Sequence, residues 1–405
     1  MYASNSAIRT VRLMRPHPGQ EGILASRARF RVVACGRRFG KTETGKLAIV
    51  CRLLANERCW WLAPTLQMAD QVWRDLKRSL AMLPEARVTE ASQRIDLPGG
   101  GMLAIRSTQQ ADHLRGAGLD FAVLDEAAFM DEQVWPEVLR PMLLERRGDA
   151  LFLSSPNGHN WFWQLYQLGL DDMQPQWRAF HFTSRDNPLV DPAELEDIRR
   201  VTPQRVFREE YLAEFLVDSG QVFGELHAAA LAPVDAQPQP GGEYVGGVDW
   251  GRERDYTAIV ILDVPARAVV ALERFRRQGW ARQRGRLQAL HARWGLQRIL
   301  AESNSVGAPN IEALQQAGLP VRAFQTTAPA KSALIDALAL ALETRRLALL
   351  PDETLLNELA NYRLQRRPGG GYRYGAPPGL HDDLVIALAL AWYALQHSGK
   401  TLDFA

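Results

Sequence analysis

The chain has 405 residues, 46% of them hydrophobic, and its 48 Lys and Arg nearly balance its 46 Asp and Glu, leaving a formal net charge of +2. This length and composition suggest two or three domains with full-sized cores, and they exclude a disordered chain. No apolar run reaches the ~18 residues of a membrane-spanning helix, and the N-terminus lacks the apolar core of a signal peptide, so we expect no membrane partner. The three cysteines form no C-x-x-C pair. We therefore expect a protein of the reducing cytoplasm without a disulfide framework or a zinc site.

The first part of the chain alternates short apolar strands with helical stretches. Strands are expected at 29–35, 58–64, 120–127 and 149–156, helices at 41–55 and 67–83, and a hairpin at 93–107. This alternation predicts a mostly parallel sheet with helices on its faces, and we assign residues 1–160 to it. Residues 161–220, which hold a helix, a short strand at 177–183 and a helical pair, are expected to form a small lid subdomain.

A second α/β domain is expected over residues 244–405. A stretch rich in Pro and Gly at 231–242 has no periodicity, so residues 221–243 are expected to be a linker. The second domain is expected to have strands at 244–251, 256–264, 268–275, 298–304 and 321–326. Helices are expected at 281–294, 331–344 and 381–396, with one more between the strands at 298–304 and 321–326. A basic hairpin is expected at 362–375. Three strands joined by tight turns, followed by an alternating α/β order, predict a mixed sheet.

The segment VVACGRRFGKTETGK, residues 32–46, departs from the pattern of a phosphate-binding loop at one position. The pattern G-x-x-x-x-G-K-[ST] requires a first Gly where the chain has Cys35. The order of strand, loop and helix still provides free backbone N–H groups and a helix N-terminus for a phosphate. Lys41 is expected to reach the β- and γ-phosphates of ATP and Thr42 to hold Mg²⁺. The loop residues expected to line the nucleotide are Gly36, Arg37, Arg38, Phe39 and Gly40.

A second motif, FAVLDEA, supports the interpretation of the loop. Its apolar strand runs into Asp125, expected to organise Mg²⁺, and Glu126, expected to polarise the attacking water. The alternative is a buried strand that ends in a surface turn, and the loop upstream favours the catalytic interpretation. Gln20 is expected to pair with an adenine edge, unless it is a surface glutamine, and SSPNG (154–158) follows the next strand, where a small polar loop can sense the γ-phosphate.

Acidic residues mark the ends of elements in the second domain. Asp249 and Glu302 end predicted strands, and Asp382 and Asp383 begin the last helix. Converging carboxylates can hold two Mg²⁺ or Mn²⁺ ions ~3.5–4 Å apart, which activate water and stabilise the leaving oxygen of a phosphodiester. The alternative is that each acid is a helix cap or a turn residue. The basic hairpin close by in sequence favours a nuclease.

The order of these motifs resembles the large terminase subunit of tailed bacteriophages over nearly the whole chain. In that family the loop commonly lacks the first Gly and carries an Arg before the final G-K-T, as Arg37 does here. The resemblance implies an ASCE-type P-loop NTPase domain followed by an RNase H-like nuclease domain. It gives the residues named above the roles already expected, and it makes SSPNG the motif that couples hydrolysis to movement.

The resemblance adds one catalytic residue and shows one departure. Some members place an arginine about a dozen residues before the Asp-Glu pair, as a finger that reaches the neighbouring subunit, and HLRGAGLDFAVLDEA has Arg115 there. The alternative is a surface arginine. Many members have a further Asp soon after the paired acids, where this chain has Ile386, so a fourth carboxylate at that position is not expected.

The implied activity is that of a viral genome-packaging motor, an ATPase that drives double-stranded DNA into a procapsid and a two-metal endonuclease that cuts concatemeric DNA. The implied partners are a portal protein, a small terminase subunit and further copies of the chain in a ring, expected to be a pentamer. The expected location is the host cytoplasm, transiently on the procapsid and not in the mature virion. The alternative is a cellular DNA repair translocase or helicase with a fused nuclease, but the sequence shows no second motor domain.

Overall fold

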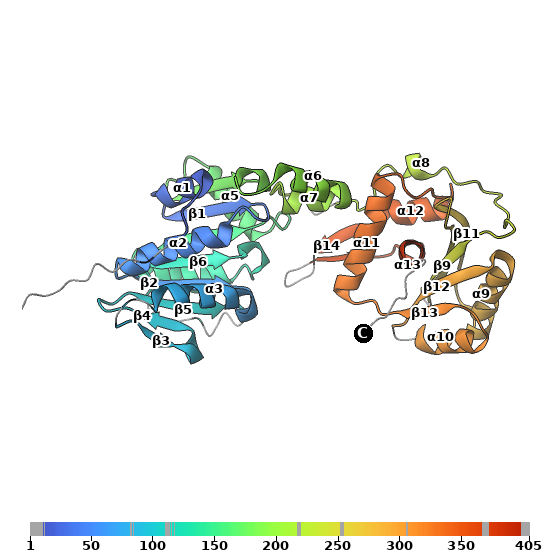
Figure 1. Cartoon of the computed structure of the whole chain (residues 1–405), viewed down its shortest axis with the longest axis horizontal. Helices are drawn as coiled ribbons and strands as arrows, with labels where there is room; N and C mark the ends of the chain where they lie inside the picture. The colour runs from blue at the N-terminus through green and yellow to red at the C-terminus, as the bar shows by residue number, and fades with distance from the viewer. Residues whose placement is uncertain are drawn as a thin grey trace, which may run out of the picture. The chain divides into compact units, whose positions relative to one another are not determined.

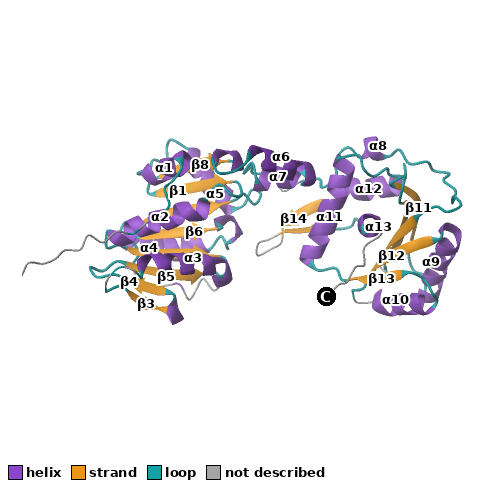
Figure 2. Cartoon of the chain, viewed as in Figure 1, coloured by secondary structure: helices purple, strands orange, loops and turns teal. Residues whose placement is uncertain are grey.

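A computed structural model of the chain describes residues 11, 13–81, 83, 85–109, 114, 116, 118–216, 220–251, 255–304, 307–366 and 372–397, and Figure 1 follows them from blue to red. The described residues form two compact units, each with its own sheet (Figure 2). The first unit takes residues up to Arg200 and those from Arg205 to 216, and the second takes 201–204 and those from 220 onward.

The first unit is built on an eight-stranded sheet in the order β3-β4-β5-β2-β6-β7-β1-β8. Its strands are β1 (Phe30–Cys35), β2 (Arg58–Ala63), β3 (Arg87–Thr89), β4 (Arg94–Asp96), β5 (Met102–Ser107), β6 (Phe121–Asp125), β7 (Asp149–Ser154) and β8 (Trp177–Phe182). The neighbours from β5 to β8 are all parallel, and β3 and β4 add an antiparallel edge. The predicted mostly parallel sheet is confirmed. The edge strand β8, expected in a lid, lies in this sheet beside β1.

Helices cover both faces of this sheet, which explains why its strands are apolar runs rather than alternating patterns. One face packs against α1 (Pro18–Ala25), α2 (Lys41–Leu54) and α3 (Leu66–Leu80), and the other against the π-helix Val134–Leu139, α4 (Arg140–Glu145) and α5 (Trp161–Leu170). Within β1, Val33 and Cys35 belong to the first face, whereas Val32 and Ala34 belong to the second. The helices α6 (Pro192–Val201) and α7 (Gln204–Glu210) follow β8.

The second unit has a five-stranded sheet in the order β11-β10-β9-β12-β13. Its strands are β9 (Tyr244–Asp249), β10 (Thr257–Asp263), β11 (Ala268–Phe275), β12 (Leu296–Glu302) and β13 (Val321–Phe324), and its helices are α8 (Leu226–Ala229), α9 (Trp280–Trp294), α10 (Gly307–Gln316), α11 (Ala328–Glu343), α12 (Glu353–Asn361) and α13 (Asp383–Gln396). Strands β9, β10 and β11 are antiparallel, whereas β9, β12 and β13 are parallel. The predicted mixed sheet is confirmed, and so is the hairpin, as β14 (Arg363–Arg366) and β15 (Tyr372–Gly375).

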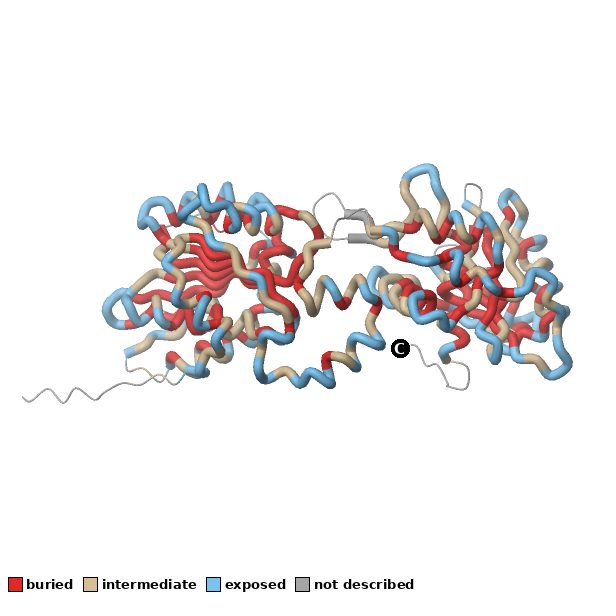
Figure 3. The backbone as a smooth tube through the Cα atoms, turned by 90° about the horizontal axis from the view of Figure 1, so that it is seen from above, coloured by how far each residue is buried: buried red, intermediate tan, exposed pale blue. Residues whose placement is uncertain are grey.

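Two helices pack on one face of this sheet and four on the other. Side chains of α9 and α10 join one core cluster, and those of α8, α11, α12 and α13 join the other. The segment expected as a linker contributes to the second cluster, because Val222, Phe223 and Ala232 are buried there. Its backbone is held too, since the N–H of Val222 donates to Tyr362 O at 3.2 Å and that of Ala232 to Leu349 O at 2.9 Å. Figure 3 shows buried backbone, in red, following the strands of each unit.

Helix α13 approaches β9 so closely that their backbones touch at a glycine. A Cβ added to Gly247 would lie 2.0 Å from Ala387 O and 2.4 Å from Ala391 N, whereas a Cβ on Gly246 would have ordinary neighbours at 3.5 Å or more. Gly247 precedes Asp249 by two residues, and Ala387 follows Asp383 by four. This contact therefore helps to bring the acidic start of α13 to the acidic end of β9. No helix among the described residues is both long and apolar enough to cross a membrane.

Replacing Gly247 by Ala is expected to destabilise the second unit, because a methyl group there must push α13 away from β9. Overpacking of this kind typically costs ~1–3 kcal/mol. The matched control, Gly246→Ala, has room for the methyl group and should change the free energy of unfolding by less than ~1 kcal/mol. Urea unfolding of the two variants beside the parent measures the difference. Equal unfolding midpoints for Gly247→Ala and Gly246→Ala would show that the two elements are not in backbone contact.

Candidate functional site

The phosphate loop joins the end of β1 to the first turn of α2. Gly40 adopts the left-handed conformation, with φ 100° and ψ 27°, immediately before Lys41 begins the helix. Arg38 is also left-handed, with φ 63°, which is uncommon for a residue other than glycine. Cys35 is completely buried, and burial raises the pKa of its thiol to about 12, so it stays neutral. The chain therefore keeps the geometry of a phosphate loop, although a small apolar residue replaces the first glycine.

The structure brings the predicted catalytic residues of the ATPase together. Strand β7 lies between β1 and β6, and because all three are parallel, their carboxyl ends meet at one edge of the sheet. Lys41 Nζ lies 2.9 Å from Glu126 Oε1. Thr42 Oγ1 donates to Asp125 Oδ2 at 3.4 Å. The two motifs, which are about eighty residues apart in the chain, thus form one site.

The electrostatics of this site suit a magnesium nucleotide. Burial, and then the neighbouring Glu126 carboxylate, raises the pKa of Asp125 to about 7. Burial opposes the charge of Lys41, but the neighbouring groups, Glu126 foremost among them, together outweigh burial, and the pKa of Lys41 is raised. Asp125 Oδ1 is buried and has no hydrogen-bond partner among the described residues. A carboxylate with an unused oxygen beside a threonine hydroxyl is the donor set that holds Mg²⁺ against ATP in P-loop enzymes.

Glu126 is held in a strained backbone conformation next to the loop SSPNG. Its φ of 58° and ψ of 44° are left-handed, and such strain is typical of functional sites. Ser154 Oγ accepts from Ala128 N at 3.2 Å and donates to Glu126 Oε2 at 3.5 Å. The Asn157 and Asn160 amides both donate to Ala128 O, at 3.3 and 2.7 Å. A shift of SSPNG would therefore move the segment that carries Glu126.

Gln20 is buried and contacts the phosphate loop itself. Its Nε2 donates to Gly40 O at 3.0 Å, and its Oε1 accepts from His17 N at 3.0 Å. His17 Nε2 in turn lies 2.9 Å from Phe39 O. The alternative of a surface glutamine is wrong, because only 1% of the residue is exposed. Pairing of Gln20 with an adenine edge stays a prediction, and bracing of the loop is a further role that the contacts support.

The other loop residues are held by the end of β8 and by the elements that follow it. Arg37 Nε donates to Glu210 Oε2 at 2.7 Å, and Ser184 Oγ donates to Arg37 O at 2.6 Å. The Phe39 ring is buried and stacks on Phe182, with centroids 4.6 Å apart, so it packs in the core rather than facing solvent. Sequence patterns did not indicate Ser184 and Glu210, because nothing in a short polar segment shows which distant loop it contacts.

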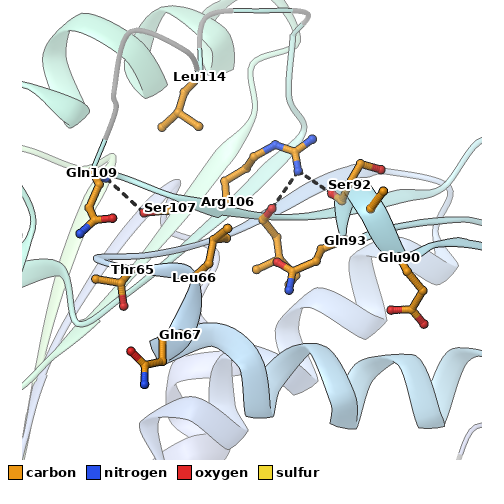
Figure 4. A pocket seen from close by; sticks show the side chains of 12 residues that line it. Thr65, Leu66, Gln67, Glu90, Ser92, Gln93, Arg106, Ser107, Gln109 and Leu114 are labelled. Carbon is orange, nitrogen blue, oxygen red and sulfur yellow. Dashed lines mark hydrogen bonds between the residues drawn. The ribbon is translucent and has the colours of Figure 1, made fainter.

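One cavity lies outside this arrangement, and one predicted catalytic residue is not among the residues that the structure describes. Arg115 falls outside the described residues. A separate cavity of about 820 Å³ (Figure 4) lies at the start of α3 and the end of β5, with lining residues that include Thr65, Gln93 and Arg106 but none of the phosphate loop. Arg106 Nη1 donates there to Ser92 O at 2.9 Å and to Ile105 O at 2.8 Å. This cavity is distinct from the nucleotide site.

The predicted nuclease acids meet in the second unit. Asp249 ends β9 and Glu302 ends the parallel neighbour β12, so their carboxyl ends lie side by side. Burial, then Glu302, and then Asp383 and Asp382 raise the pKa of Asp249 well above its usual range. Within the described residues, no group of three or more His, Cys, Asp or Glu side chains is arranged so that it could hold a metal ion as it stands. The crowded carboxylates nevertheless repel one another, and divalent cations with oxygen ligands would relieve that repulsion.

Two cations and a further carboxylate lie near these acids, and sequence patterns did not indicate them. Lys331 Nζ lies 3.4 Å from Asp382 Oδ2. Arg274 Nε lies 2.8 Å from Glu358 Oε1, and its Nη2 lies 3.8 Å from Asp383 Oδ2. Glu358 is buried, and its Oε2 accepts from Leu384 N at 2.8 Å. Burial, and then Glu358, raises the pKa of Asp383 to about 7. The two adjacent aspartates therefore have different surroundings, Asp382 at the rim beside a lysine and Asp383 buried beside an ion pair.

Comparisons with known proteins agree with this arrangement. Residues 33–226 match the family described as terminase large subunit, T4likevirus-type, N-terminal. The chain is 32% identical to the large terminase subunit of Thermus virus P23-45 over 437 aligned positions, which cover 95% of this chain and 88% of that protein. It is 34% identical to the large terminase subunit of Escherichia phage T5 over 207 positions, which cover 50% of this chain and 47% of that protein.

A solved structure extends the comparison to the fold. The large terminase of a thermophilic bacteriophage is only 16% identical, but the superposition covers 93% of this chain and 97% of that one with a TM-score of 0.60. This likeness confirms the predicted α/β fold of two successive domains. Since a relative at 32% identity spans nearly the whole chain, the chain belongs to the family of phage large terminase subunits.

Proposed function

We propose that this chain is the motor subunit that packages a viral genome, with ATP hydrolysis driving double-stranded DNA into a procapsid and a two-metal nuclease cutting concatemeric DNA. The observation that carries the proposal is the presence of two separate acid sites in one chain. Lys41 and Thr42 meet Glu126 and Asp125 in the first unit, and Asp249 lies among three further carboxylates in the second.

Each side chain has a defined part in this proposal. Lys41 would contact the β- and γ-phosphates, Thr42 and Asp125 would hold Mg²⁺, and Glu126 would orient and deprotonate the attacking water. Ser154 is hydrogen-bonded to both Ala128 and Glu126. These hydrogen bonds support a role of SSPNG in transmitting the loss of the γ-phosphate to the rest of the unit. In the second unit, Asp249 and its neighbouring carboxylates would hold two Mg²⁺ or Mn²⁺ ions that activate water against a phosphodiester.

The proposed partners follow from membership of the family. We infer that copies of the chain form a ring, proposed to be a pentamer, on the portal protein of the procapsid, and that a small terminase subunit brings the DNA. The ring would act in the host cytoplasm and leave before the virion matures.

One set of assays on the purified chain tests this function. ATP hydrolysis is measured with and without double-stranded DNA, nicking of supercoiled plasmid is measured with Mg²⁺ or Mn²⁺, and procapsids with portal are supplied to test whether DNA becomes protected from DNase. We expect DNA-stimulated hydrolysis, metal-dependent nicking and ATP-dependent protection. Hydrolysis without any protection of DNA in complete procapsid mixtures would refute the packaging role.

The role of Arg115 is tested by mixing variants. An arginine supplied from a neighbouring subunit is worth ~10³–10⁵ in turnover, so Arg115→Ala should be nearly inactive alone. Mixed with Lys41→Ala, it should regain part of the activity, because each variant then supplies what the other lacks. ATP turnover in mixed assemblies at several ratios is the measurement. If both variants assemble and no mixture exceeds the separate activities, Arg115 does not act between subunits.

A further inference from the structure

Lys331 stands at the rim of the nuclease carboxylates without a role in the function proposed so far. Its ammonium lies 3.4 Å from Asp382 Oδ2, and its side chain is 27% exposed. It is the only lysine among the residues that the structure describes in the second unit. A lysine ammonium is a compact point charge on a flexible stem, which suits a contact with a phosphate.

The start of α11 is tied to the same cluster from another side. Asn304 Nδ2 donates to Glu302 Oε1 at 3.2 Å and to Thr326 O at 2.9 Å, just before the helix begins. Thr327 caps α11 by accepting from Ala330 N at 3.3 Å, and Thr327 is exposed. The first turn of a helix carries partial positive charge. The ammonium of Lys331 and the N-terminus of α11 thus both lie next to acids expected to hold metal ions.

The second cation near the cluster is held more closely than Lys331, whose ammonium lies 5.9 Å from the ring centre of Tyr362. Arg274 is paired with the buried Glu358 at 2.8 Å, and its guanidinium lies 3.5 Å from the ring centre of Tyr256. Releasing Arg274 would leave Glu358 buried without a counter-charge, which is costly. Lys331 faces Asp382, whose side chain is 30% exposed, and metal ions on the carboxylates would take over the neutralisation of that acid. Lys331 is therefore the cation that can turn to a substrate.

We propose that Lys331, with the first turn of α11, contacts a phosphate of the DNA strand that is cut, and that it is a catalytic residue of the nuclease. The inference rests on the proposed nuclease function and adds a substrate contact to it. In the absence of DNA and metal, Lys331 neutralises Asp382. With metal ions held by the carboxylates, the ammonium of Lys331 would be free to contact the phosphate, where it would offset the negative charge that develops as the phosphodiester is attacked.

The test compares Lys331→Met with Arg345→Met. Both remove one positive charge from the second unit, but the Arg345 guanidinium is 71% exposed and lies 3.6 Å from Glu225 instead of a nuclease acid. Plasmid nicking is measured under single-turnover conditions with Mg²⁺, and DNA affinity is measured in Ca²⁺ over a series of salt concentrations. Lys331→Met should nick ~10²-fold more slowly, and the slope of log affinity against log salt should become shallower by ~0.9, as for one lost phosphate contact. Arg345→Met should change neither quantity.

Several outcomes separate this inference from its alternatives. Lys331→Arg should restore part of the nicking rate, and Lys331→Gln gives the same comparison if Met lowers the unfolding midpoint. A slower rate with an unchanged salt slope would mean that Lys331 is only the counter-ion of Asp382, and the inference would be wrong. Nicking by Lys331→Met at the parent rate, with the salt slope of the parent, would also overturn the inference. Asp249→Asn is run alongside, because normal nicking by that variant would refute the nuclease itself rather than the role of Lys331.

Discussion

Replacement of Lys41 by Ala is expected to abolish ATP hydrolysis by the purified chain. Lys41 begins α2 directly after the loop, and its ammonium is the cation that lies 2.9 Å from Glu126. Without it, the β- and γ-phosphates would face the carboxylates of Asp125 and Glu126 and would lose the ammonium that offsets those charges. Loss of such an electrostatic contact typically costs ~10²–10³ in turnover, and more when nucleotide binding is lost with it. ATP turnover with saturating DNA measures the effect.

Lys46 provides a matched control on the same helix. Its ammonium is paired with Glu43 at 2.6 Å and Asp75 at 2.9 Å, so Lys46→Ala removes a partly buried lysine from α2 without touching the nucleotide site. Lys46→Ala should keep ATP turnover near that of the parent. Lys41→Ala should keep plasmid nicking, because the acids of the nuclease belong to the other unit. If the two variants hydrolysed ATP equally well, the assignment of the phosphate loop would be wrong.

Glu126→Ala separates binding of ATP from its hydrolysis. Lys41 and the loop backbone stay in place in this variant, so we expect nucleotide to bind, but the water loses its base, which typically costs ~10²–10⁴ in rate. Binding of a fluorescent ATP analogue and turnover of ATP are measured on one preparation. Hydrolysis at the parent rate would mean that another group activates the water.

The sequence predicted the ATPase residues because each motif is continuous with its own strand. Cys35 ends β1 and Asp125 ends β6, and parallel strands bring such ends to one edge of the sheet, so Lys41 and Glu126 could be expected to meet. The supports of the loop could not be predicted in this way. Ser184 and Glu210 lie about 150 residues or more beyond the loop, in segments whose short-range patterns indicate only turns and helix. Strand β8 was expected in a lid for the same reason, since its pattern does not say which strand it joins.

The nuclease acids followed the same logic, whereas their neighbours did not. Asp249 and Glu302 end adjacent parallel strands, and the aspartates begin a helix whose residues are almost all buried. Glu358 and Arg274 come from the middle of α12 and from β11, where a single charged residue usually marks a solvated face. Only the packing of α12 against α13 makes Glu358 a buried acceptor for Leu384 N. No further acid was expected at Ile386 after the aspartates, but Glu358 brings an additional carboxylate next to Asp383 from a different helix.

The two sites differ in how their acids are balanced. In the ATPase site, Lys41 belongs to the loop motif itself and faces Glu126. One cation is therefore both the ion-pair partner of Glu126 and the expected contact of the ATP phosphates. In the nuclease, the buried Asp383 has Arg274 nearby at 3.8 Å, and the exposed rim has Lys331. Asp249 interacts with Glu302 and with both aspartates, and the neighbours that shift its pKa are all carboxylates. It is therefore the acid whose loss should change the metal site most.

Asp249→Asn is expected to eliminate plasmid cleavage with Mg²⁺ or Mn²⁺, by ~10³-fold or more, while ATP turnover stays near normal. The amide keeps the shape of the side chain and removes the charge. An acid that interacts with Glu302 and with both aspartates could bridge both metal ions, so its loss should remove both sites together. DNA binding should tighten, because a negative charge that faces the phosphates is gone.

The measurement is nicking of supercoiled plasmid over a metal titration, run beside an ATPase assay on the same preparation. A matched control is Asp263→Asn, at the end of β10, where the carboxylate accepts from Ala266 N at 2.8 Å in a turn. That variant removes one acid from the same sheet and should cut at the parent rate. Two results carry the assignment, loss of cutting in Asp249→Asn at every metal concentration and normal cutting in Asp263→Asn. Undiminished cleavage by Asp249→Asn would refute a two-metal nuclease in the second unit, and the DNA-cutting half of the proposed function would have to be abandoned while the ATPase half remained.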